Sequence, residues 1–281
     1  VDYEDKQEQA IQKRIDEAVA EATKGLVNKK DIYIDIFQRP IDDRQFNKTL
    51  LKEVIPCLDS INQMAFYLRT LTDPSDHTVN GITNEFDYSD SLFSNIKSIE
   101  DRGLFRCFYK YPGWHNNETP KKVGKLGIKF SSLVKCSSSA LDSFNFTHIY
   151  FPKLTKYSPP LLEGSYFLTW VRFDALKEIT GTSKYSSFLG DREGSNYDFD
   201  QLKAIVLSSN TLVTLKNSIA LIGPPTSTYC PISPSYTGTI EGYIYVPKAL
   251  VEDYKTATNW SVFADKFRAI EDYPEICNEG V

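Results

Sequence analysis

Three segments of the chain share one pattern. They are Ile128-Lys-Phe130-Ser-Ser-Leu133-Val-Lys-Cys136, Ile149-Tyr-Phe151-Pro-Lys-Leu154-Thr-Lys-Tyr157 and Val171-Arg-Phe173-Asp-Ala-Leu176-Lys-Glu-Ile179. Each copy reads apolar-x-Phe-x-x-Leu-x-(Lys/Glu)-x, and its phenylalanine recurs after 21 and then 22 residues. A fourth segment, Ile205-Val-Leu207, keeps only the beginning of the pattern. The sequence therefore predicts short strands that are stacked at a regular spacing.

A spacing in the low twenties is typical of a leucine-rich-repeat solenoid, in which each repeat buries its apolar face against its neighbours. We therefore expect an α/β, β-rich solenoid of a few coils over residues 92–240. Because side chains alternate along a strand, one set should point into its core. This inward set is Ile128, Phe130, Ile149, Phe151, Val171, Phe173, Ile205, Leu207, Ile244 and Val246.

Two segments precede the repeats. Residues 4–30 are rich in Glu, Gln, Lys and Ala and contain no Pro, which predicts a helical arm over residues 1–30. Two apolar seams would each suit a short coiled coil, and a surface helix or an arm that docks on a partner fits the segment equally well. One seam is Ile11, Ile15, Ala18 and Ala22, and the other is Ile15, Val19, Ala22 and Leu26.

Residues 31–91 predict a small α/β unit, which is either an entry domain or an N-terminal cap of the solenoid. They begin with an alternating strand over residues 31–37 and continue as helical stripes on both sides of Pro56. The second stripe runs through Leu58 and Ile61 to about Thr70.

Residues 241–281 predict a helical capping module at the other end of the solenoid. Tyr243 to Val246 form the expected last strand, and Pro247 suits the first turn of a helix that carries Tyr254. A second short helix, starting at Asn259 or Ser261, would cover the open end of the stack. The side chains expected to seal that end are Val262, Phe263 and Phe267.

Two stretches resemble a known family. The copies around Phe130, Phe151 and Phe173 resemble the BspA-like leucine-rich repeats of bacterial surface proteins. The stretch from Gly242 to Ile270 resembles the closing module of such proteins from gut bacteria and from the tailed phages that infect them. The resemblance covers roughly residues 92–272 and implies a binding or scaffolding role without chemistry.

Composition and motifs argue against an enzyme and against a nucleic-acid-binding protein. The net charge is −5, whereas nucleic-acid sites need clustered Lys and Arg. The sequence contains no glycine-rich phosphate loop, no nucleophile elbow and no His-Glu-x-x-His motif. The three histidines and five cysteines have no spacing that suits a metal. We therefore expect no catalytic residue, no metal and no cofactor.

Three further possibilities are calcium binding, a carbohydrate-processing site and membrane insertion, and the sequence argues against each. Acidic clusters within residues 73–90 and 191–200 are better explained as solvated loops than as calcium sites. A carbohydrate-processing site between loops 109–125 and 181–200 is disfavoured because no acid/base pair has a suitable spacing. No apolar run approaches the roughly 18 residues that a membrane span needs, so no membrane insertion is expected.

One column of side chains is the candidate binding surface. The strand residues between the inward ones should face outward, and Tyr, Trp and Arg are enriched at binding hot spots. Two alternatives remain, namely an aromatic ladder that only stabilises the sheet and a contact with a neighbouring subunit. The column comprises Lys129, His148, Tyr150, Trp170, Arg172, Tyr243 and Tyr245.

These features together predict a non-enzymatic virion component of a tailed phage, such as a tail-fibre, baseplate or decoration subunit. It would oligomerise through residues 4–30, contact other virion or surface proteins, and present its repeat surface to a host-surface glycan or protein. The alternative is an adhesin module at the bacterial cell surface or secreted, from which a leader has been removed. A start at Val1 fits a processed chain or a fragment.

Overall fold

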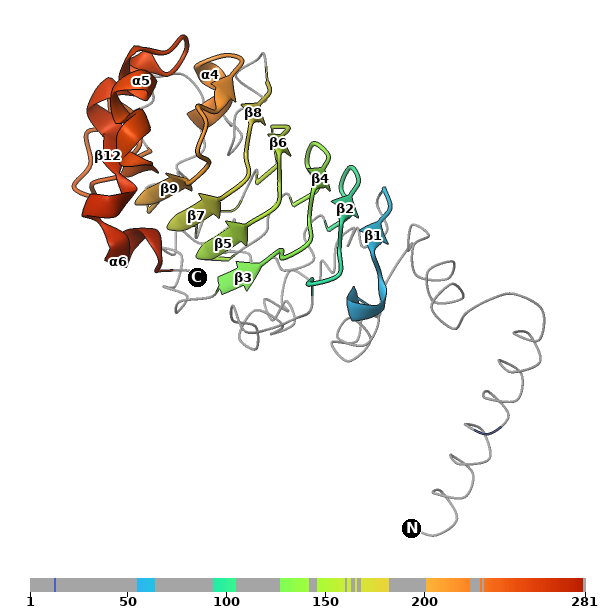
Figure 1. The fold of residues 1–281 in the computed structure, drawn as a ribbon. Coiled ribbons are helices and arrows are strands. Elements are labelled where there is room, and N and C mark those ends of the chain that lie inside the picture. Colours follow the sequence, from blue (N-terminus) through green and yellow to red (C-terminus); the bar gives the residue numbers. More distant parts are fainter. Residues whose placement is uncertain are drawn as a thin grey trace, which may run out of the picture.

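The computed structural model, drawn in Figure 1, describes residues 55–63, 93–104, 127–141, 146–159, 161–162, 168–181, 201–222 and 230–279, together with the single residues 13, 165 and 228. Of the predicted arm it describes only Lys13, which is helical. The two acidic clusters and the insertions at 109–125 and 182–200 lie outside the described residues.

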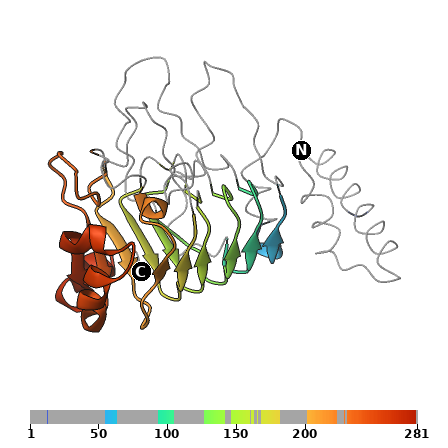
Figure 2. The same cartoon turned by 90° about the horizontal axis from the view of Figure 1, so that it is seen from above.

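Each repeat contributes a longer and a shorter strand, and neighbouring strands always pair in parallel. The longer strands form one six-stranded sheet, in the order β12-β11-β9-β7-β5-β3. Its members are β3 (Gly127–Lys129), β5 (His148–Phe151), β7 (Trp170–Phe173), β9 (Ala204–Leu207), β11 (Tyr243–Val246) and β12 (Phe267–Ala269). Figure 2 shows β-strands side by side in chain order, with the C-terminal helices at one end.

The shorter strands form two three-stranded sheets beside the first one. One contains β1 (Ser60–Ile61), β2 (Ser98–Ile99) and β4 (Lys135–Cys136), and the other contains β6 (Lys156–Tyr157), β8 (Glu178–Ile179) and β10 (Thr214–Leu215). In Figure 1 these strands form a row that runs alongside β3, β5, β7 and β9. The side of these six short strands that faces solvent is called the short-strand face below.

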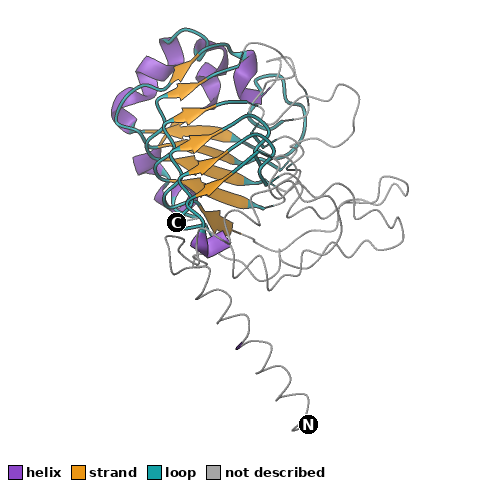
Figure 3. Ribbon diagram, turned by 90° about the vertical axis from the view of Figure 1, so that its right-hand side faces the viewer, coloured by secondary structure: helices purple, strands orange, loops and turns teal. Residues whose placement is uncertain are grey.

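Helical elements in the described residues are few and short. They are η1 (Ile55–Cys57), α4 (Ile219–Ile222), η3 (Lys248–Leu250), α5 (Val251–Thr256), η4 (Ser261–Lys266), η5 (Ile270–Asp272) and α6 (Pro274–Cys277). Figure 3 shows these helices at the periphery of the strands. None of the helices in the described part of the chain has the length and apolar character that crossing a membrane requires.

The register confirms the alignment of the repeats. Ile149 pairs with Val171 and Phe151 pairs with Phe173, and the next strand continues both rows with Ile205 and Leu207. The whole predicted inward set is buried. Phe151 stacks between its two counterparts, with its ring centroid 5.3 Å from Phe130 and 5.1 Å from Phe173. The core is therefore a set of like residues placed one above another.

The predicted fold class, a leucine-rich-repeat solenoid, was wrong. The described residues form three parallel sheets, one of them six-stranded, with few helices, which is an α/β-like arrangement. The pattern suggested one strand in each repeat, but its second half, Leu-x-(Lys/Glu)-x, forms another strand of two residues. Cys136, Tyr157 and Ile179 are the buried residues of these additional strands, and they pair in sheets of their own.

The helix predicted through Leu58 and Ile61 was also wrong at these residues. Ser60 and Ile61 form β1, and Ile61 pairs with Ile99 of β2. Both Leu58 and Ile61 are fully buried in the same core as the repeats. Their spacing of three residues suits a helix face, but here the burial of both against the repeats decides their conformation.

The structure shows the strand and the first helix that were predicted within residues 241–281. β11 and α5 lie where they were predicted, and Tyr254, Phe263 and Phe267 are buried. Two details differ. Val262 is 43% exposed, and β11 is not the last strand because Phe267–Ala269 form β12, which pairs with β11 in parallel.

Candidate functional site

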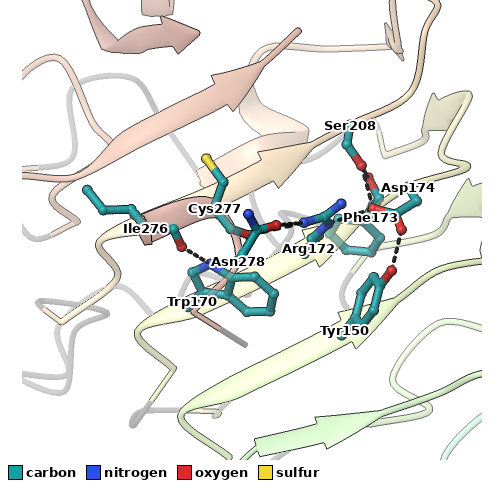
Figure 4. Close-up of polar contacts among 9 residues, drawn as sticks. All are labelled: Tyr150, Trp170, Arg172, Phe173, Asp174, Ser208, Ile276, Cys277 and Asn278. Atoms are coloured by element: carbon teal, nitrogen blue, oxygen red, sulfur yellow. Dashed lines mark hydrogen bonds and ion pairs between the residues drawn. The ribbon is translucent and has the colours of Figure 1, made fainter. Parts of the chain in front are cut away.

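A segment from the C-terminal module covers the outer face of the six-stranded sheet. It consists of residues 270–279, which include η5 and α6, and is called the strap below. The indole Nε1 of Trp170 donates a hydrogen bond of 2.9 Å to the carbonyl oxygen of Ile276, as Figure 4 shows. Tyr273 packs edge-on against Tyr245, with ring centroids 5.7 Å apart. The strap is therefore attached to β7 and to β11.

The strap and the sheet enclose a second apolar cluster outside the main core. Its buried members are Tyr150, Trp170, Ala204, Val206, Tyr245 and Cys277. Ile270, Tyr273 and Ile276 of the strap pack against it. Trp170 is only 1% exposed, so this cluster is closed to solvent at its centre.

The predicted outward column lies on one face, as expected, but most of it is not available to a ligand. His148, Tyr150, Trp170 and Tyr245 are buried. Lys129, Arg172 and Tyr243 remain partly exposed at its margins. The period of the strands revealed which residues share a face. What covers that face is a segment of the same chain, about a hundred residues away from Trp170.

A polar network ties the strap to the sheet at the edge of this cluster. Asp174 accepts hydrogen bonds from the hydroxyls of Tyr150 and Ser208, and from Nε of Arg172 at 2.6 Å. Nη1 of Arg172 donates to Oδ1 of Asn278 at 2.8 Å and to the carbonyl oxygen of Cys277 at 3.2 Å. Arg172 thus connects Asp174 with the strap, as the dashed lines in Figure 4 show.

The protonation states in this network follow from its surroundings. Burial favours the neutral form of Asp174, but hydrogen bonds from Ser208, Tyr150 and Arg172 outweigh it and lower the pKa of Asp174. Burial, reinforced by the bond to Asp174, raises the pKa of Tyr150 to about 12. At neutral pH, Tyr150 is therefore a hydrogen-bond donor and Asp174 a charged acceptor. The polar groups of Asp174, Tyr150 and Arg172 form hydrogen bonds with one another and with the strap. We therefore assign this network a structural role, which is to hold the strap on the sheet.

The polar network around Asp174 should make the free energy of unfolding depend on pH. In the unfolded chain Asp174 binds its proton near its ordinary pKa of 3.8, whereas in the native state it does so only at lower pH. The unfolded state consequently binds more protons in acid, and the contribution of Asp174, complete above about pH 5, is lost as the pH falls through its native pKa. Urea unfolding between pH 3 and 7 should show a shallower acid decline for Asp174→Asn than for the unaltered protein.

The matched control for this experiment is Glu252→Gln. Glu252 is exposed on α5 and bonds only to residues of its own helix, Lys255 and Thr256. We expect its profile to follow that of the unaltered protein. Parallel profiles for Asp174→Asn and the unaltered protein would contradict the proposed role of Asp174.

Two further contacts fix the margins of the covered face. His148 contacts the hydroxyl of Thr147 through Nδ1 at 2.8 Å, and its Nε2 lies 3.3 Å from Oε1 of Glu279 in the strap. On the other margin the guanidinium carbon of Arg268 lies 4.0 Å from the ring centroid of Tyr243. The partly exposed residues of the column are therefore also held by neighbours.

The short-strand face is a second candidate surface, and it carries lysines. Lys135 of β4 and Lys156 of β6 are exposed, and Lys177 and Lys216 are exposed beside β8 and β10. Glu178 of β8 accepts from Nζ of Lys156 at 3.0 Å and lies 3.2 Å from Nζ of Lys216. The lysine side chains of these two pairs are 58% and 53% exposed, so both ammonium groups remain accessible.

The sequence held a signal for this surface. The pattern shared by the repeats has a Lys/Glu position, occupied by Lys135, Lys156 and Glu178. Lys156 pairs with Glu178 in the register, which shows that this position forms a row. It was not predicted to be a site because the strands that align it were not recognised.

A metal centre requires several ligating side chains close together. Among the described residues no group of three or more His, Cys, Asp and Glu side chains could hold a metal ion. A scan against protein-family models finds no family that matches this chain, and a search of curated proteins finds no protein that matches it.

Proposed function

We propose that this protein is a non-enzymatic binding and structural protein, a virion component of a tailed phage, and that it presents the short-strand face for attachment. The short-strand face itself is the observation that carries the binding role. On it, Lys135 of β4 and Lys156 of β6 are exposed at the same position of successive repeats, and the register places Glu178 of β8 directly beside Lys156.

The proposed attachment surface differs from the one that the strand pattern first suggested. The aromatic column is closed by the strap, whereas the lysines of the short-strand face are exposed. A group of exposed lysines on neighbouring strands of a rigid sheet suits the binding of an extended partner, because many weak contacts can form together. Placement in a virion is supported by the resemblance of residues 242–270 to phage closing modules and by the coiled-coil spacing within residues 4–30.

The solution mass of the full chain tests this proposal. Light scattering should give an oligomer, which we expect to be a trimer, as a fibre or collar part requires. The triple variant Ile11→Gln, Ile15→Gln, Val19→Gln should reduce the mass to that of a monomer, because it removes two apolar residues from each of the two possible seams of the predicted coiled coil.

A matched variant, Glu17→Gln with Lys24→Gln, alters the same segment outside both seams and should keep the oligomer. A monomer for all three proteins would overturn the virion proposal. That result would favour the adhesin module, which needs no partner copy to bind its ligand.

A further inference from the structure

We infer that the short-strand face binds an acidic polysaccharide, a chain of sugars that carry carboxylate or sulfate groups, and that Glu178 restrains its affinity. This inference rests on the proposed attachment role and identifies the chemical class of the ligand. It is carried by the placement of the lysines, by the residues around them and by the contacts of Glu178.

The lysines form a positive row within an acidic protein. Four segments build the face between β4 and β10, namely residues 133–137, 154–158, 176–180 and 213–217. They contain four lysines, Lys135, Lys156, Lys177 and Lys216, and one carboxylate, Glu178. The chain as a whole has a net charge of −5. The excess of positive charge on this face is therefore local, and it would draw an anionic chain to this side of the molecule.

The geometry suits a linear ligand. The strands β6, β8 and β10 are neighbours in one sheet, and β4 contacts β6. The register places Lys156 opposite Glu178, so Lys156 starts about 5–6 Å from Lys177 on the adjacent strand, whereas Lys216, two residues beyond the partner of Glu178, starts about 10–12 Å from Lys156. Because each lysine is a point charge on a flexible stem, it can adjust to acidic groups that recur along a polymer at intervals of this order.

The residue types favour a polysaccharide over a nucleic acid. Nucleic acids are bound by aromatic side chains that stack on bases and by arginines that contact phosphates and base edges. The four segments contain no Arg, and their one aromatic residue, Tyr157, is fully buried.

Glu178 occupies the centre of the row and engages two of its lysines. Its hydrogen bonds with Lys156 and Lys216 lower the pKa of Glu178, so it remains a carboxylate in neutral solution. It therefore competes with the acidic groups of a ligand for Lys156 and Lys216. Replacing it with glutamine should free both lysines and strengthen binding, which a purely structural salt bridge would not do.

Binding to polygalacturonate, measured by calorimetry on the full chain at low salt, tests the inference. We expect binding that weakens as salt is added, and no binding to neutral dextran. Lys135→Glu with Lys156→Glu should weaken binding by at least roughly tenfold, since it reverses two charges of the row. Glu178→Gln should strengthen binding several-fold.

Two controls show whether a change in affinity comes from the short-strand face itself, from the net charge of the protein or from a loss of folding. Lys203→Glu with Lys248→Glu changes two exposed lysines elsewhere by the same charge, and its affinity should stay within about twofold of the unaltered protein. All variants should unfold at the same temperature as the unaltered protein because the altered side chains lie at the surface.

Three results would overturn the inference: no binding to polygalacturonate or dextran sulfate at low salt, equal losses in both double-lysine variants, or tighter binding to a single-stranded DNA oligonucleotide than to polygalacturonate. The light-scattering test is independent of these results. An oligomer that does not bind acidic polysaccharide refutes only the ligand class, whereas a monomer that binds it refutes only the virion role.

Discussion

Replacing Phe151 with alanine should lower the free energy of unfolding by about 3–5 kcal/mol, because this ring fills the centre of the core. Phe151 is fully buried between the rings of Phe130 and Phe173, and both neighbours stack on it almost face to face. Strands on both sides hold those neighbours in register, so they cannot move together to fill the space. The cavity would therefore persist, and urea unfolding followed by circular dichroism would measure its cost.

Two companion variants show whether the loss comes from the stack. Phe151→Leu keeps most of the apolar volume and should cost less than Phe151→Ala. Val134→Ala removes a side chain that is 46% exposed, and it should change stability by no more than about 0.5 kcal/mol. If Phe151→Ala were as stable as Val134→Ala, the stacked phenylalanines would not be the centre of the core.

Replacing Trp170 with alanine should detach the strap and expose the thiol of Cys277. Trp170 donates a hydrogen bond to Ile276 and fills the apolar cluster beneath the strap. Its removal should lower the free energy of unfolding by about 3–5 kcal/mol if the strap remains in place, and by less if it releases. Burial raises the pKa of Cys277 to about 12, so the unaltered protein should react slowly with iodoacetamide at pH 8.

The readout is the rate at which the peptide containing Cys277 is alkylated, followed by mass spectrometry. We expect Trp170→Ala to raise this rate at least roughly tenfold, since the thiol is fully buried before the change. Cys230, which is buried in the main core, is the internal control and should keep its rate. Trp170→Phe retains a ring but loses the hydrogen bond, and it should give an intermediate rate. An unchanged rate in Trp170→Ala would mean that the strap stays attached without this residue.

The sequence predicts well which residues of the six-stranded sheet point into the core, and it predicts poorly the short strands beside that sheet. Residues such as Ile149 and Phe151 recur with a period of two within a strand and with a fixed step between strands, so one pattern identifies both the strand and its inward face. A strand of two residues, such as Lys156–Tyr157, is too short to show a period. The second row of strands was therefore missed, and with it the true fold class.

The candidate column illustrates the same limit. Tyr150, Trp170 and Arg172 do share the outer face of the sheet, as alternation requires. Alternation cannot show that Ile276 and Asn278, which follow about a hundred residues later, close over that face. The polar partners of Arg172 and Tyr150 in the network, Asp174 and Ser208, were also not predicted, since no motif joins them and only the pairing of β7 with β9 brings them together.

The C-terminal module binds to the main chain of the segment around β10, the last of the short strands. The hydroxyl of Tyr254 accepts from the backbone N–H of Val213, and Nε1 of Trp260 donates to the carbonyl oxygen of the same residue. Nδ2 of Asn259, whose φ is 65°, donates to the carbonyl oxygen of Leu215. Every residue except proline offers these backbone groups, whatever its side chain. These contacts should therefore tolerate substitution of the exposed side chains of the last short strand, because they are made with its main chain.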